Sequence, residues 1–119
     1  MSKVRAFLRE KRHRKAVDRA RLLERARDDA EGIRERIARE VRPARIYQWG
    51  SLLTGEHFSE ISDIDFALEG LSGPPEYFRV LGIAMEETTL PVDIIELEKV
   101  DPDTRERIIW RGRLAYERQ

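Results

Sequence analysis

Apolar residues recur at intervals of three and four along the first forty positions. They are Ala16, Ala20, Leu23, Ala26, Ala30, Ile33, Ile37 and Val41. This spacing predicts one face of a helix over residues 4–41, and Pro43 ends it because the residue before a proline is pushed out of the helical region. The face is narrow and rich in alanine before Ile33. We therefore expect the C-terminal third of the helix to pack on the rest of the protein, while the earlier part projects or packs on another chain.

After the proline, the apolar stretches become shorter and are rich in β-branched and aromatic residues, which suits strands. The predicted strands cover residues 45–49, 63–68 and 92–97. In the second of them, Ile64, Phe66 and Leu68 are two residues apart, so they share the face that we expect to point into the core.

Two further helices are expected, over residues 76–87 after a pair of prolines and over residues 104–111 after an Asp-Pro-Asp sequence. Residues 114–116 could add a short extended tail. The order of helix, strand, strand, helix, strand and helix predicts an α+β (mixed α/β) domain, in which helices flank a small mixed sheet and the N-terminal helix is extended.

Composition divides the chain by charge. The 119 residues, 40% of them hydrophobic, suffice for one domain with a modest core. Residues 1–45 contain 16 Lys or Arg and 8 Asp or Glu, whereas residues 46–119 contain 7 and 15. We therefore distinguish a basic helix at residues 1–42, which serves packing or forms a homo-oligomer, from an acidic domain at residues 43–119. The basic helix could also bind nucleic acid, but no aromatic side chains for base stacking interleave its charges, so this is the less favoured partner.

Other features exclude several classes of protein. The chain has no cysteine, which excludes disulfides, thiolate metal sites and cysteine nucleophiles. No apolar run approaches the ~20 residues that cross a membrane, and the N-terminus lacks the hydrophobic segment of a secretory signal. We therefore expect a cytoplasmic protein that does not bind a membrane.

Three aspartates interrupt otherwise apolar strands. Asp63 and Asp65 are two residues apart and share a face, and Asp93 has Val92 on one side and Ile94 on the other, which predicts that it is buried. If the three carboxylates converge, their repulsion favours a bound cation, so they are candidate ligands for divalent metal ions. The alternative is a half-exposed strand whose polar face happens to carry acids.

A Gly-Ser pair lies directly after the first predicted strand and 12 residues before Asp63. Gly50 would let the backbone approach a phosphate, and the Ser51 hydroxyl with the amides that follow would donate hydrogen bonds to it. An ordinary turn would have the same sequence, and the position between the strand and the aspartates is what favours a phosphate site.

Together these residues resemble the signature of the nucleotidyltransferase superfamily that includes DNA polymerase beta and kanamycin nucleotidyltransferase, and in particular its small minimal nucleotidyltransferase branch. The resemblance covers roughly residues 46–116. It implies transfer of a nucleoside monophosphate from a nucleoside triphosphate, with ATP the expected one, to an acceptor hydroxyl. Asp63, Asp65 and Asp93 would be catalytic and would bind two Mg²⁺ ions, with Asp93 helping to deprotonate the hydroxyl. Gly50 and Ser51 would position the β- and γ-phosphates.

The resemblance also implies a partner. Small members are often paired with a helical HEPN-domain toxin, and some act as antitoxins by adenylylating a tyrosine of that toxin. One position departs from the pattern, because Thr54 stands where members of the branch commonly have a basic residue. This departure keeps open an alternative, in which the protein is a non-catalytic, antitoxin-like module that neutralises a partner by contact.

Overall fold

The computed structural model describes residues 2–119. Its elements in chain order are α1 (Lys3–Glu40), β1 (Arg45–Trp49), α2 (Ser51–Thr54), β2 (Ile64–Glu69), α3 (Pro74–Glu87), β3 (Val92–Glu96), the 3-10 turn η1 (Leu97–Lys99), α4 (Pro102–Arg111) and β4 (Arg113–Glu117). The expected helices and strands are all present, with ends that differ by one or two residues. The C-terminal tail is a full strand of the sheet, and this gives the α+β fold a fourth strand.

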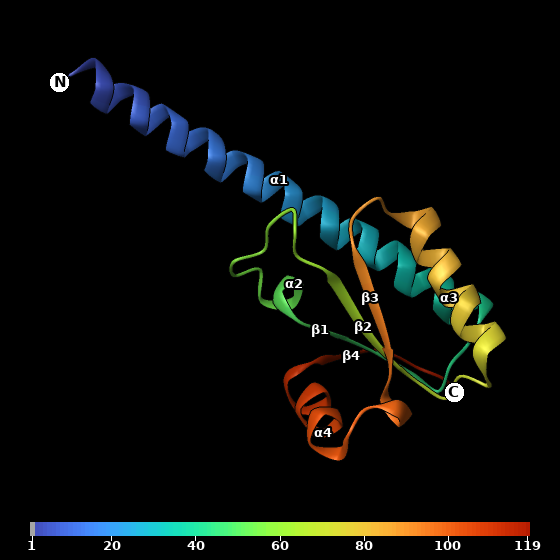
Figure 1. Cartoon of the computed structure of the whole chain (residues 1–119). Helices are drawn as coiled ribbons and strands as arrows, with labels where there is room; N and C mark the ends of the chain where they lie inside the picture. The colour runs from blue at the N-terminus through green and yellow to red at the C-terminus, as the bar shows by residue number, and fades with distance from the viewer. Residues whose placement is uncertain (1) are drawn as a thin grey trace.

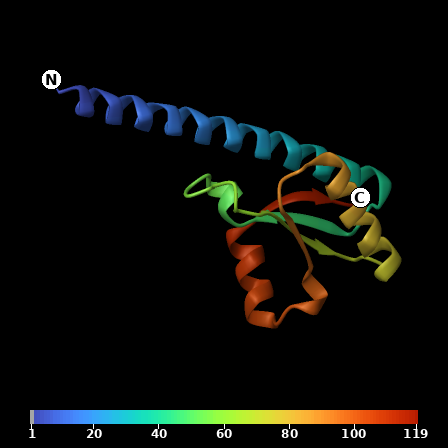
Figure 2. The same cartoon turned by 45° about the horizontal axis from the view of Figure 1, so that its top comes forward.

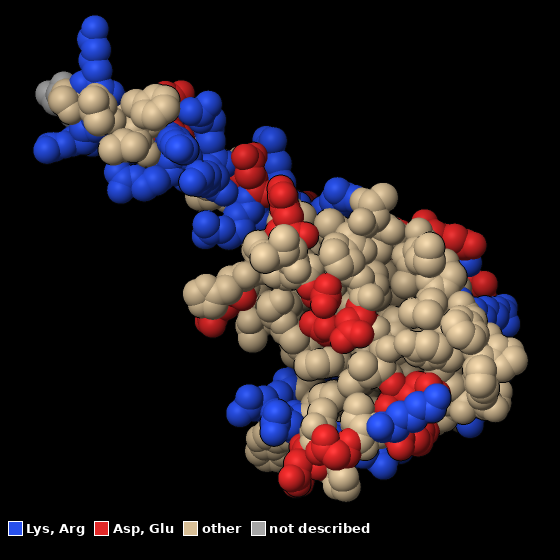
Figure 3. Space-filling model, viewed as in Figure 1, with Lys and Arg blue, Asp and Glu red and all other residues tan. Residues whose placement is uncertain are grey.

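Helix α1 is a single helix of 38 residues that begins where the Ser2 hydroxyl accepts a hydrogen bond from the Arg5 amide at 3.1 Å. Its later part packs on the body through Ala26, Ala30, Ile33 and Ile37, which are all buried. Residues 2–16 are all exposed, and Figures 1 and 3 show this part extending away from the body with mostly Lys and Arg on the side in view. The expected division of α1 into a packed part and a projecting part is confirmed, and what the projecting part contacts stays a prediction.

The four strands form one mixed sheet in the order β3-β2-β1-β4. β1 is antiparallel to both β2 and β4, whereas β2 and β3 are parallel and are joined through α3. As a consequence, the C-terminal end of β1 lies at the same end of the sheet as the N-terminal ends of β2 and β3. The register places Trp49 opposite Asp65, and Asp65 opposite Asp93.

The two faces of the sheet are covered differently (Figure 2). Helices α1 and α3 cover one face, where Ile64, Phe66 and Leu68 are fully buried as predicted. Helix α4 covers part of the other face, which we call the α4 face, over a small cluster. This cluster consists of Tyr47, Ala67, Leu97 and Ile108. Because side chains alternate along a strand, residues next to the core positions of β2 and β3 point to the α4 face.

Within residues 2–119, no helix combines the length and the apolar character needed to cross a bilayer. The division of the chain at residue 42 stays a prediction, although the buried side chains of α1 make the end of this helix part of the core.

Candidate active site

The strand β2 presents two of the predicted aspartates. Asp65 is the second residue of β2, and Asp63 directly precedes the strand. Both lie on the α4 side, because Ile64 and Phe66 point to the core under α1 and α3. Asp65 is partly buried and Asp63 is exposed. The predicted strand began one residue too early, which does not change the face that the carboxylates share.

The parallel neighbour of β2 brings the third aspartate to the same place. Asp93 of β3 is the register partner of Asp65, and adjacent strands lie about 4.8 Å apart. The prediction that Asp93 is buried is wrong, since the structure leaves it exposed. The reason is the alternation of the strand, which turns Ile94 into the core and therefore turns Asp93 outward. The fold thus places all three acids at one end of the α4 face.

Electrostatics show that these carboxylates influence one another. Burial, together with the smaller effects of the negative charges of Asp93 and Asp63, raises the pKa of Asp65 to about 7. Nevertheless, among residues 2–119 no three or more His, Cys, Asp or Glu side chains are already gathered as a set of metal ligands. The acids are therefore close enough to repel but do not point at one common centre. A divalent cation would oppose this repulsion, so the residues present suit one by their chemistry.

Gly50 brings the Gly-Ser turn against the carboxylates. Its φ of 83° and ψ of −167° belong to a region that is essentially restricted to glycine. A Cβ added to Gly50 would lie 2.1 Å from Oδ2 of Asp65, far inside van der Waals contact. Only glycine therefore fits at this point, where β1 ends and its backbone passes the side chain of Asp65.

The short helix α2 continues from this turn. Ser51 is its first residue, and the Thr54 hydroxyl donates a hydrogen bond to the Ser51 carbonyl at 3.3 Å while it accepts one from the Glu56 amide at 3.3 Å. Thr54 thus closes its own turn. Gly55 ends the helix in a left-handed conformation. The structure places Gly50 beside Asp65 and Ser51 next to it at the start of α2, and their roles toward phosphate stay predictions.

A cavity of about 300 Å³ adjoins the turn and was not foreseen from the sequence. Its lining consists of Trp49, Gly50, Leu53, Thr54, Thr104, Arg107, Ile108 and Arg111. Helical spacing alone shows that the last four share one face of α4, but only the packing of α4 places that face beside α2. In Figure 3, Asp and Glu atoms gather over the beginnings of β2 and β3, and Lys and Arg atoms gather over the C-terminal end of α4 on the same side of the molecule.

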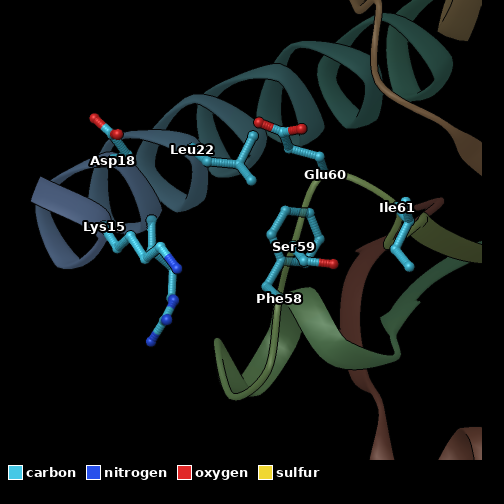
Figure 4. A pocket seen from close by; sticks show the side chains of 8 residues that line it. Lys15, Asp18, Leu22, Phe58, Ser59, Glu60 and Ile61 are labelled. Carbon is cyan, nitrogen blue, oxygen red and sulfur yellow. The ribbon is translucent and has the colours of Figure 1, made fainter. Parts of the chain in front are cut away.

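A larger cavity, of about 560 Å³, lies away from the aspartates. It separates α1 from the loop at residues 58–61, and Figure 4 shows Leu22 extending from α1 toward the ring of Phe58. None of the predicted site residues lines it. Size therefore does not identify the candidate site, whereas the grouping of acids does.

Most of the chain matches a known protein family. Residues 31–119 match the family described as Polymerase beta, Nucleotidyltransferase. The chain belongs to this nucleotidyltransferase family. The match contains the aspartates, the Gly-Ser turn and the last ten residues of α1, and it confirms the resemblance seen in the sequence. No curated protein matches the chain.

Two solved structures resemble this nucleotidyltransferase-family chain. One is a protein assigned as a minimal nucleotidyltransferase, with a TM-score of 0.63 and 23% identity over 76% of this chain and 93% of that one. The other is a chain from the crystal structure of the toxin–antitoxin MntA–HpeT, in a variant with two aspartates, two residues apart, replaced by glutamate. Its TM-score is 0.55, with 17% identity over 71% of this chain and 70% of that one. These likenesses show the fold, and they confirm the expected mixed sheet flanked by helices.

Proposed function

We propose that the protein is an active nucleotidyltransferase that transfers a nucleoside monophosphate from a nucleoside triphosphate, with ATP the expected donor, to an acceptor hydroxyl. The observation that carries the proposal is the meeting of Asp63, Asp65 and Asp93 on one side of the sheet, beside Gly50, where a side chain would collide with Asp65. Membership of the family supports this reading of the carboxylates.

In this proposal, Asp63, Asp65 and Asp93 would hold two Mg²⁺ ions at the triphosphate. When bound, these ions neutralise phosphate charge and lower the pKa of the acceptor hydroxyl. The Gly50–Ser51 turn holds the β- and γ-phosphates, and Asp93 helps to remove the proton of the hydroxyl. The hydroxyl oxygen then bonds to the α-phosphorus, and the bond from the α-phosphorus to the bridging oxygen breaks to release pyrophosphate.

The test is a transfer assay with Mg²⁺, labelled ATP or other nucleoside triphosphates, and candidate acceptor proteins. We expect Asp63→Asn and Asp65→Asn each to reduce transfer by a factor of about a thousand or more, because each removes an ionic ligand where charge develops. Asp28→Asn, which removes an exposed acid of α1 on the opposite face of the sheet, is the matched control and should retain activity. Equal transfer by the wild type and both site variants would refute the proposal that the protein is an active nucleotidyltransferase.

A second candidate is an antitoxin that neutralises a toxin by contact, without turnover. The similarity to a chain of a toxin–antitoxin structure favours it, and so does Thr54, which stands where members of the minimal branch commonly have a basic residue. The expected partner is a helical HEPN-domain toxin, which could also be the tyrosine-bearing acceptor of the enzymatic reaction.

Co-expression with a candidate toxin separates the two functions. If the protein acts by catalysis, Asp65→Asn should bind the toxin but fail to neutralise it, and the toxin should lack an added nucleotide in mass spectrometry. Neutralisation that survives loss of Asp63, Asp65 and Asp93 would instead establish the contact mechanism.

A further inference from the structure

Two arginines of the acidic domain differ in their interactions from its other basic residues. Seven Lys or Arg follow residue 45. Five of them form ion pairs or hydrogen bonds within the chain, and these are Arg79, Lys99, Arg105, Arg113 and Arg118. Among the interactions of residues 2–119, the other two, Arg107 and Arg111, form neither. Both are exposed, and both line the 300 Å³ cavity beside α2.

The placement of this pair is unfavourable for the protein alone. Residues four apart are neighbours on a helix, and like charges there destabilise the helix. Asp103 and Glu106 line a neighbouring hollow with both arginines, yet neither acid forms an ion pair with them. Two guanidinium groups that face one cavity without a carboxylate partner are an arrangement suited to an anion, and guanidinium binds phosphate oxygens in bidentate pairs.

The cavity adjoins the aspartates at Gly50. Gly50 lines the cavity and also contacts Asp65, so one residue separates the two surfaces. Trp49 forms another part of the wall, and its buried indole N–H has no acceptor among the described residues. A polyphosphate held at Asp65 through metal ions would therefore reach the arginines after passing only the Gly-Ser turn.

We infer that Arg107 and Arg111 bind the terminal phosphates of the donor triphosphate, at the end of the site opposite to the carboxylates. The identity of the anion as a nucleoside triphosphate rests on the proposed function, whereas the binding of a polyphosphate does not. The arginines of α4 supply positive charge that α2 itself lacks, because its four residues, Ser51–Thr54, include no basic side chain. They act as binding residues and take no part in proton transfer.

The test measures binding of inorganic tripolyphosphate without metal. Trp110, which is 87% exposed, is replaced by phenylalanine so that Trp49 is the single tryptophan and reports on the cavity by its fluorescence. Asp65→Asn is added to reduce repulsion of the anion. In this background, we expect Arg107→Gln and Arg111→Gln each to weaken binding about tenfold or more, because each removes a charge-assisted pair of hydrogen bonds.

The matched control is Arg105→Gln, on the same helix, whose guanidinium forms an ion pair with Glu69 at 3.2 Å and does not line the cavity. It should bind tripolyphosphate within about twofold of its parent if screening by salt limits the effect of distant charges. Arg107→Lys should keep part of the affinity, since it preserves the charge but not the planar fork.

Three results would overturn the inference: no binding of tripolyphosphate, equal binding after loss of Arg107 and Arg111, or an equal loss in Arg105→Gln. Binding of adenosine in place of tripolyphosphate would also overturn it and would assign the cavity to a base. Because the assay contains no metal and measures no transfer, it is independent of the proposed reaction. If the protein binds tripolyphosphate through these arginines but transfers nothing, this inference holds and the proposed enzymatic function fails.

Discussion

On one face of the sheet, α1 and α3 lie over all-apolar positions that are almost completely buried, whereas on the other face α4 covers Tyr47 and Ala67 and leaves Asp65 and Asp93 in contact with solvent. The first face supplies most of the hydrophobic stabilisation. One end of the second face stays open to solvent, and this allows three carboxylates to lie together there. The same four strands therefore separate stability from chemistry by the alternation of their side chains.

The largest effect should come from a matched pair of neighbours on β3. Ile94 is 3% exposed on the face under α1 and α3, and Ile95 is partly buried on the α4 face. We expect Ile94→Ala to lower the free energy of unfolding by about 2–5 kcal/mol, because it leaves a cavity in a close-packed core. Ile95→Ala should lower it by about 1–2 kcal/mol, because folding buries less of the apolar surface of Ile95 than of Ile94. Urea denaturation measures both. Equal losses would contradict the difference between the faces.

An intermediate effect is expected at the glycine beside Asp65. Gly50→Ala should lower the free energy of unfolding by about 1–3 kcal/mol, since its backbone conformation disfavours a side chain and the new Cβ would collide with Oδ2 of Asp65. Gly82→Ala in α3 is the control, because nothing lies within 4 Å of its added Cβ. That change should be neutral or should stabilise the protein by up to about 1 kcal/mol.

Thermal unfolding of both glycine variants, with and without Asp65→Ala, would separate the two causes at Gly50. The part of the loss that is due to collision should disappear in the double variant, whereas the part that is due to φ should remain. A Gly50→Ala protein as stable as the wild type would show that the turn does not press on Asp65.

The smallest effect concerns pH. In chelator-treated protein, the folded-state pKa of Asp65 is about 7 and lies above its usual value of 3.8, so the folded state holds this proton more tightly than the unfolded state. Stability should therefore fall as pH rises from about 4 to 7. Asp65→Asn removes this loss, and at pH 8 it should be more stable than the wild type by about 1–2 kcal/mol, which discounts the full shift for the solvent that still reaches the group.

Thermal denaturation from pH 3 to pH 8 measures this difference, which should become small below the usual pKa of 3.8, where Asp65 is mostly protonated in both states. Added Mg²⁺ or Mn²⁺ should stabilise the wild type at pH 8 and not Asp65→Asn. If the two proteins have the same pH dependence without metal, burial and the neighbouring acids do not raise the pKa of Asp65 in the folded state.

Much of the fold could be predicted because it follows from the spacing of apolar residues that are close together in the sequence. The spacing of Ile33 and Ile37 identified the packed end of α1, and the alternation of Ile64, Phe66 and Leu68 identified both the core face of β2 and the opposite face of its aspartates. The exposure of Asp93 could not be judged from its apolar neighbours, because a strand that is buried on one face can be open on the other.

The sequence by itself determined the elements, the charge division and the three aspartates with their Gly-Ser turn, since each depends on residues close together in the chain. Only the tertiary structure decided which strands pair, so that Asp65 meets Asp93, and that Gly50 lies against Asp65. It also decided that α4 brings Arg107 and Arg111 beside α2 to form a cavity. The physical reason is that these contacts join segments far apart in sequence, and their geometry is set by packing of the whole sheet and its helices rather than by any local pattern.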